Sequence, residues 1–249
     1  MVYNWLLKLH QKVFPSQCRL CRAPGEPGLE LCPACRNDLP WLAHACRVCA
    51  MPLPPDADAT VCARCQNTVS PIDECRALFT YHPPVDGWVQ RLKFEQDLAV
   101  GRLLGALLAD SLSPDAEAPS ASILPVPLHR KRLSERGYNQ AMEIARPLAG
   151  LGYRIETRCC RRVRNTGAQS GLSAASRKGN VRGAFLATQP LHGRRFILID
   201  DVLTTGSTLN ELARTLKRGG AQSVKAWVVA RAVQGKGSAG RHAPLNVIP

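Results

Sequence analysis

Apolar and polar positions along most of the chain fall into two alternating patterns. Short continuous apolar runs predict buried strands, and stretches in which apolar residues recur every three or four positions predict amphipathic helices. The predicted strands are residues 77–82, 122–126, 157–164, a short one around Phe185, 196–199 and 224–230, and the predicted helices are 85–94, 99–112, 139–149 and 209–218. Such an alternation implies an α/β fold whose central parallel sheet is covered by helices on both faces.

The amino-terminal part follows a different pattern, set by cysteines. Eight of the eleven cysteines form four Cys-x-x-Cys pairs: Cys18/Cys21, Cys32/Cys35, Cys46/Cys49 and Cys62/Cys65. Each pair can aim two thiolates at one metal, and a closed structural site gives Zn²⁺ four sulfurs at about 2.3 Å. Sequential pairing would make two tandem zinc ribbons, although the spacing also permits interleaved pairing. Redox dithiols are the weaker alternative, because redox motifs seldom occur four in a row. We therefore predict two structural Zn²⁺ ions.

These patterns divide the chain near Ser70. Residues 1–70 are predicted to hold an amphipathic helix and the double zinc ribbon, 71–232 the α/β domain, and 233–249 a tail. Lys8 and His10 interrupt the apolar positions of the first 14 residues, which favours a docking helix over a signal peptide. No apolar run reaches the roughly 18 residues of a membrane span. Paired cysteines without a secretion signal favour a reducing cytoplasm.

Charge changes the picture for the larger domain. The formal net charge is +14, but the first 75 residues hold seven basic and seven acidic side chains, so the whole excess lies in residues 76–249. That region should attract anions such as phosphates, nucleotides or nucleic acid, although a basic surface can also serve solubility alone.

The strongest candidate site follows the apolar run 196–199. Asp200 and Asp201 come next, and a small polar loop then leads into the predicted helix; its residues are Thr204, Thr205, Gly206, Ser207 and Thr208. Ligands of α/β sheets bind at the carboxyl ends of strands, and a helix amino terminus with a Gly-containing loop can cradle phosphate. Two adjacent carboxylates would repel that phosphate unless sugar hydroxyls or a divalent metal satisfied them, so ribose 5-phosphate fits. Simple helix capping would explain only one of the acids.

At these residues the chain resembles the type I phosphoribosyltransferases, in which an acid pair follows four apolar residues and precedes a Thr-Thr-Gly-Ser/Thr-Thr loop. The resemblance implies that Asp200 and Asp201 hold the ribose hydroxyls. It also implies that the loop from Thr204 to Thr208 holds the 5-phosphate of phosphoribosyl pyrophosphate.

Three further motifs narrow the resemblance. They are PVPLHRKRL at residues 125–133, RGYNQ at 136–140, and Arg164-x-Thr166-x-x-Gln169-x-x-Leu172. With the cysteine-rich front, they resemble the ComF family and its GntX-like members, which are associated with natural competence and the use of imported DNA. By position, a basic loop holding Arg130, Lys131 and Arg132 corresponds to the pyrophosphate loop. Arg164 and Gln169 fall where a flexible hood closes over the ligand.

The resemblance implies transfer of a phosphoribosyl group, in which a nitrogen nucleophile displaces pyrophosphate from ribose C1. Mg²⁺ would bind the leaving group, and Asp200, Asp201, Arg130 and Lys131 are the candidate catalytic residues. Nothing in the sequence marks the acceptor.

The alternatives are a ligand sensor without turnover, or a competence factor that binds single-stranded DNA or DNA-uptake proteins. Single-strand binding favours aromatic stacking platforms, but aromatic residues make up only 5% of the chain. Tyr138 is the main aromatic residue within a basic segment, and we expect Trp88, Phe94 and Trp227 to lie in the core.

Overall fold

A computed structural model describes residues 16–111, 120–166 and 181–233. Three sequence predictions lie outside these ranges: the amino-terminal helix, Gln169 in its hood segment, and almost all of the tail. Within the described ranges, no helix combines the length and the apolar character that crossing a membrane requires.

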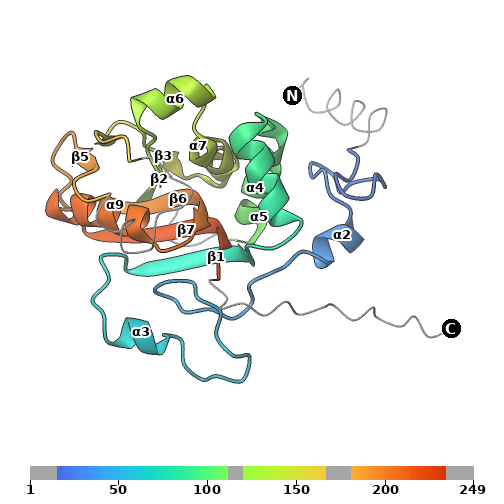
Figure 1. The fold of residues 1–249 in the computed structure, drawn as a ribbon, viewed down its shortest axis with the longest axis horizontal. Coiled ribbons are helices and arrows are strands. Elements are labelled where there is room, and N and C mark those ends of the chain that lie inside the picture. Colours follow the sequence, from blue (N-terminus) through green and yellow to red (C-terminus); the bar gives the residue numbers. More distant parts are fainter. Residues whose placement is uncertain (1–15, 112–119, 167–180, 234–249) are drawn as a thin grey trace.

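A five-stranded parallel sheet forms the centre of the fold (Figure 1). Its strands, in spatial order, are β1 (Glu74–Thr80), β7 (Ser223–Arg231), β6 (Arg195–Leu203), β2 (Ala121–Pro125) and β3 (Arg154–Ile155). The register places Ile199 of β6 opposite Trp227 of β7. The central strands β6 and β7 are almost continuously buried, as expected for strands covered on both faces.

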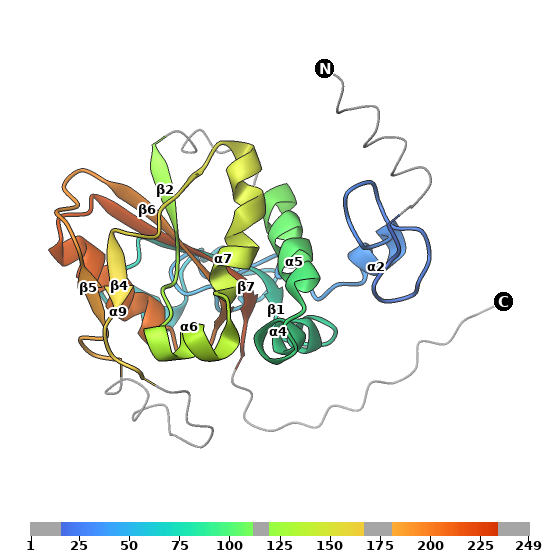
Figure 2. The same ribbon diagram turned by 90° about the horizontal axis from the view of Figure 1, so that it is seen from above.

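Helices cover both faces of this sheet (Figure 2). One face carries α4 (Val85–Phe94), α5 (Leu98–Ser111), α7 (Gln140–Ala145) and the 3₁₀ helix η1 (Arg146–Leu151), and the other carries α9 (Ser207–Arg218). Side chains of β6 alternate between the two cores: Ile197 belongs to the first, and Phe196 and Leu198 belong to the second. The predicted α/β architecture is confirmed.

A small antiparallel pair lies beside α9, formed by β4 (Cys160–Arg162) and β5 (Phe185–Ala187). The strand predicted at residues 157–164 is therefore shorter than expected, and the two-residue β3 was missed. Such short strands are paired through tertiary context, which local patterns do not report.

Two predictions about the ends of strands were wrong. β6 continues past the apolar run to Leu203, so Asp200 and Asp201 lie inside the strand, with Asp200 opposite Val228. The basic segment predicted as a loop forms the helix α6 (Arg130–Arg136). His129 caps this helix by accepting a hydrogen bond from the Lys131 N–H. Charged side chains are good helix formers, so a charge run alone did not exclude a helix.

The cysteine-rich segment packs directly against the α/β domain. Trp41 stacks at 4.6 Å on Phe79 of β1, and the Leu42 N–H donates to the Leu78 carbonyl at 2.8 Å. Ion pairs join the first ribbon to the helices, from Arg19 to Asp97 at 3.0 Å and from Arg36 to Asp110 at 3.3 Å. The apolar core is continuous across the boundary predicted near Ser70, which itself stays a prediction.

Candidate metal and ligand sites

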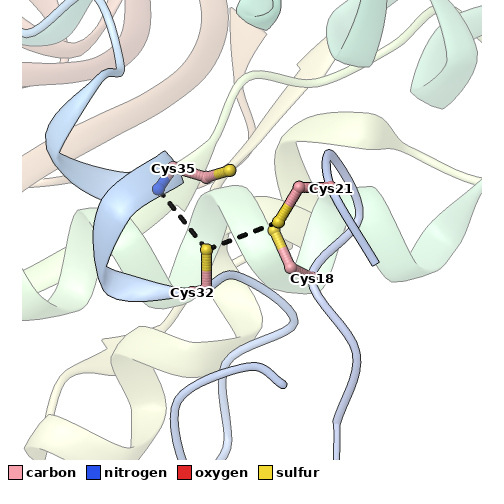
Figure 3. Close-up of side chains that lie close together, drawn as sticks. All are labelled: Cys18, Cys21, Cys32 and Cys35. Carbon is pink, nitrogen blue, oxygen red and sulfur yellow. Dashed lines mark hydrogen bonds between the residues drawn. The ribbon is translucent and has the colours of Figure 1, made fainter. Parts of the chain in front are cut away.

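The paired cysteines gather into two clusters, and each cluster joins consecutive pairs. In each cluster the four sulfurs lie within 4.8 Å of one another; the clusters are Cys18, Cys21, Cys32, Cys35 and Cys46, Cys49, Cys62, Cys65. Figure 3 shows the first cluster, in which a short helix, α2 (Pro33–Asn37), carries Cys35. The sequential pairing is thus the one that the fold adopts, and α3 (Ala63–Gln66) has the corresponding place in the second cluster.

The spacing of the sulfurs fits tetrahedral zinc. The Cys21 and Cys32 sulfurs are 3.6 Å apart, and the Cys49 and Cys62 sulfurs are 3.8 Å apart. Four Zn–S bonds of about 2.3 Å in a tetrahedron give sulfur–sulfur edges of about 3.8 Å, whereas a disulfide requires about 2.05 Å. Four protein sulfurs leave no open position for water, so these are structural sites.

Electrostatics prepares one thiol of each cluster for ionisation. Burial raises the pKa of Cys18, but hydrogen bonds from backbone N–H groups, including that of Cys21, outweigh it and bring the pKa to about 6. The same competition brings the pKa of Cys46 to about 7. Hydrogen bonding to the Cys21 and Cys32 sulfurs raises the pKa of Cys35. A bound metal ion would stabilise all four thiolates of a cluster, including those whose pKa is raised by a neighbouring thiol.

The other three cysteines, Cys75, Cys159 and Cys160, are buried and belong to neither cluster. Burial is the main cause that raises the pKa of Cys75 and Cys160 to about 12 and that of Cys159 to about 11.

The acid pair meets a lysine from a distant part of the chain. Asp201 is 3% exposed, and its Oδ2 lies 2.8 Å from Nζ of Lys93 in the last turn of α4. Its Oδ1 accepts a hydrogen bond from the Val202 N–H at 2.7 Å. Lys93 is not predictable as a partner of the acid pair from sequence, because α4 and β6 are far apart along the chain and no local motif connects them.

Asp200 holds its proton far more strongly than an ordinary aspartate. Its pKa rises to about 7, mainly because of burial and then because of the adjacent Asp201 carboxylate. Lys93 and Arg162 act in the opposite direction and limit the rise. Asp200 is therefore poised near neutral pH to donate a hydrogen bond or, once ionised, to accept one.

The polar loop lies between the end of β6 and the start of α9. Gly206 has φ of +77°, a left-handed conformation that favours glycine, and it has no side chain with which to cap the helix; the hydroxyl oxygen of Thr205 accepts a long hydrogen bond of 3.4 Å from the Ser207 N–H. The Thr205 and Ser207 hydroxyl oxygens are 2.9 Å apart. Thr204 is exposed, and Thr205 through Thr208 are partly buried. Uncapped N–H groups at the start of a 12-residue helix make this loop suited to an anion.

Arg162 is the basic side chain whose electrostatics involve the acid pair. Burial, followed by the charge of Arg132, lowers the pKa of Arg162, while the charge of Asp200 raises it. Arg162 also donates to the Thr166 hydroxyl. Arg130 and Lys131 are exposed on α6 and form no ion pair within the described ranges. Arg164 is exposed and donates to the Arg182 carbonyl at 2.6 Å.

Of the three aromatic residues that we expected to lie in the core, two are buried and one is exposed. Trp88 and Trp227 are buried, but Phe94 is 74% exposed at the end of α4. Arg136 of α6 lies over the Phe94 ring at 5.9 Å, and Tyr138 donates to the Leu92 carbonyl. The prediction for Phe94 was wrong because the buried stripe of α4 ends at Leu92, and Phe94, two residues further along in the last turn, does not lie on that face of the helix.

Two family models match parts of the chain. Residues 9–66 match the double zinc ribbon domain, and residues 134–242 match the phosphoribosyl transferase domain. A solved structure of HGPRT-ase from Leishmania tarentolae in complex with GMP shares 17% identity at a TM-score of 0.32, covering 54% of this chain and 68% of that one. This distant likeness adds nothing to the assignment.

Relatives that match most of the chain are more informative. DNA utilization protein YhgH of Salmonella typhimurium is 33% identical over 87% of this chain and 97% of its own length. Competence protein F of Haemophilus influenzae is 32% identical over 81% of this chain and 90% of its own length. Competence protein ComFC of Streptococcus pneumoniae is 28% identical over 63% and 67% of the two chains. The chain belongs to the ComF family of competence and DNA-utilisation proteins, with a double zinc ribbon joined to a phosphoribosyltransferase domain.

Proposed function

We propose that this protein binds phosphoribosyl pyrophosphate between the acid pair of β6 and the loop that starts α9, and transfers its phosphoribosyl group to an acceptor. This proposal rests mainly on one observation: the acid pair and the loop that starts α9 follow one another directly along the chain. Asp200 and Asp201 lie on the strand that leads into the loop, and the loop ends at an uncapped helix amino terminus. A ribose 5-phosphate presents hydroxyls and phosphate in that order.

In this proposal, the ribose hydroxyls hydrogen-bond to Asp200 and Asp201, and the 5-phosphate accepts hydrogen bonds from the N–H groups and hydroxyls between Thr204 and Thr208. Lys93 keeps the charge of Asp201 balanced before the sugar arrives. No protein nucleophile is needed, because the acceptor displaces pyrophosphate. Positioning and charge stabilisation would supply the rate.

The leaving pyrophosphate needs positive charge. Arg162 interacts electrostatically with Asp200, so it is the basic group of this segment that the structure relates directly to the acid pair. Arg132 lies within electrostatic range of Arg162, and Arg130, Lys131 and Arg164 are exposed basic side chains that could also receive the pyrophosphate. A magnesium ion would neutralise further charge on the pyrophosphate. The elevated pKa of Asp200 beside Asp201 supports a place for a cation here, because a cation relieves repulsion between two carboxylates.

The printed names of the relatives support a role in DNA uptake or in the use of imported DNA. Work in a reducing compartment such as the cytoplasm agrees with the structure of the ribbons, in which all eight cysteine ligands carry free thiols.

Calorimetric titration of the zinc-loaded protein with phosphoribosyl pyrophosphate, with and without Mg²⁺, tests the ligand. We expect binding that the double variant Asp200→Asn/Asp201→Asn loses. Asp58→Asn is the matched control, because Asp58 is an exposed carboxylate in the second ribbon. Absence of binding to the folded wild type would overturn the proposal, whereas binding without pyrophosphate release in an acceptor screen would favour a sensor.

A second candidate function is binding of single-stranded DNA, which the exposed ring of Phe94 beside Arg136 favours. An exposed aromatic ring next to a guanidinium can stack on a base. Fluorescence anisotropy with a labelled oligonucleotide tests this: Phe94→Ala should weaken binding, and Leu133→Ala, which removes an exposed apolar side chain from α6, should not. Equal affinity of Phe94→Ala and wild type would remove this candidate.

A further inference from the structure

Arg231 forms a buried link between the second zinc ribbon and the loop proposed to bind phosphate. It lies at the end of β7 and is 3% exposed. Its Nε donates to the carbonyl of Cys49 at 3.0 Å. Its Nη1 donates to the carbonyls of Leu203 and Thr204 at 2.7 and 2.5 Å. One guanidinium thus joins a knuckle of the metal cluster to the point where β6 becomes the loop.

These contacts fix the direction of the loop backbone. In a trans peptide the C=O and the following N–H lie in one plane and point in opposite directions. The carbonyls of Leu203 and Thr204 point to Arg231, so the N–H groups of Thr204 and Thr205 point away from it. Arg231 therefore sets the orientation of the first two donors that a bound anion would meet.

Two further features tie the same ribbon to this end of the sheet. The Cys75 N–H at the start of β1 donates to the Arg47 carbonyl at 2.7 Å, and Ala50 belongs to the same buried cluster as Leu203 and Leu209. A cavity of about 410 Å³ lies beside these contacts, lined by residues of both parts, including Arg64 and Thr205. The cavity leaves fewer packing contacts between the second ribbon and the loop, so the hydrogen bonds of Arg231 contribute a large part of the interaction between them.

The positive charge of the buried Arg231 side chain makes its position depend on the second cysteine cluster. A buried guanidinium needs a compensating negative charge. A zinc ion with four thiolates carries a net charge of about −2, and the cluster that contains Cys49 would supply this charge beside Arg231. The first ribbon has a different role, because Arg19 connects it to Asp97 next to α5 and not to the loop.

We propose that Arg231 is a positioning residue through which the second zinc ribbon holds the loop from Leu203 to Thr208 in its anion-binding form, an inference that rests on the proposed function for the loop's ligand. The zinc ribbons are then not equivalent: the second supports ligand binding and the first supports only its own fold and its contact with the helices.

Hydrogen exchange of the zinc-loaded full chain tests the link without any ligand. The Ala232 N–H donates to the Leu203 carbonyl at 3.0 Å, so Ala232 and peptides covering residues 203–210 report on the junction. We expect Arg231→Lys and Cys65→Ser to accelerate this exchange on the order of tenfold. The matched controls, Arg218→Lys on the exposed side of α9 and Cys35→Ser in the first ribbon, should leave it unchanged. Arg231→Lys should still bind two zinc ions, which separates the link from loss of metal.

Affinity for phosphoribosyl pyrophosphate, measured on the same four variants, gives the second readout. We expect Kd to rise about tenfold in Arg231→Lys and Cys65→Ser and to stay constant in the controls. Unchanged exchange at Ala232 and residues 203–210 in both variants would overturn the link, as would an equal effect of Cys35→Ser. If exchange responds as expected but wild type does not bind the ligand, the proposed function fails and the link to the second ribbon stands.

Discussion

Lys93 and Asp201 form an ion pair between the last turn of α4 and the carboxyl-terminal part of strand β6, with 2.8 Å between Nζ and Oδ2. The carboxylate is buried and the lysine is partly exposed. Lys93→Met leaves a buried charge without its partner, so we expect the free energy of unfolding to fall by about 3 kcal/mol at pH 7. Urea denaturation measures this change.

A double-mutant cycle separates the pair from the packing of the lysine stem. Lys93→Met/Asp201→Asn should recover part of the stability that Lys93→Met loses, because no buried charge is left unpaired. Additive effects of the two single substitutions would show that the pair contributes nothing. Lys131→Met is the control on an exposed lysine of α6 and should change stability by less than about 0.5 kcal/mol.

The raised pKa of Asp200 makes stability depend on pH. The unfolded side chain titrates near about 3.9, and the folded one near about 7. Between these values the folded state binds a proton that the unfolded state lacks, so the free energy of unfolding falls as pH rises from about 4 to about 7. Asp200→Asn should lose this decline and exceed the wild type at pH 8 by on the order of 4 kcal/mol, because the two pKa values differ by about three and each pKa unit corresponds to about 1.36 kcal/mol.

Denaturant titrations of both proteins at pH 5 and pH 8 check this sign. The difference between wild type and Asp200→Asn is the relevant quantity, because it cancels the contributions of groups that do not interact with Asp200 and leaves those of Asp200 and its charged neighbours. A difference that does not change between the two pH values would mean that Asp200 ionises normally. Ligand binding should also depress the pKa of Asp200 if the bound sugar donates to its carboxylate.

Periodicity predicted the elements that position the site. The bounds of α4 agree with the prediction, and the acid pair and the loop were found because they are consecutive in sequence. The end of β6 was misplaced because aspartates are poor strand formers, and pairing of Asp200 with Val228 overrides that preference. Two residues of the sequence do mark the ends of α6: His129 caps its amino end, and Gly137, with φ of +80°, ends the helix in the left-handed conformation typical of glycine.

The rest of the site could not have been found in this way. Lys93, Arg162 and Arg231 belong to three separate elements, α4, β4 and β7, and only the tertiary fold brings these residues into range of the acid pair or the loop. Sequence spacing likewise left the pairing of the cysteine pairs open, and the packing of each ribbon decides it.

The two cysteine clusters predict a metal content of two zinc ions per chain. Native mass spectrometry should find two in the wild type and one in Cys21→Ser and in Cys49→Ser, because each substitution removes one thiolate from a different cluster. Cys160→Ser is the control, since Cys160 is buried away from both clusters. One zinc ion in wild type, or a loss of both from a single substitution, would contradict two independent structural sites.

Two glycines in the helices should respond oppositely to alanine. A Cβ on Gly105 of α5 would lie 2.3 Å from the Ile144 carbonyl oxygen and 2.9 Å from the Pro147 ring, whereas a Cβ on Gly87 of α4 would meet nothing within 4 Å. Gly105→Ala must force α5 away from α7 and η1, and should cost about 1–3 kcal/mol. Gly87→Ala gains helix propensity and should stabilise by up to about 1 kcal/mol. Thermal unfolding of both variants compares them directly, and a Gly105→Ala protein as stable as the wild type would mean that α5 packs less closely against Ile144 than this structure has it.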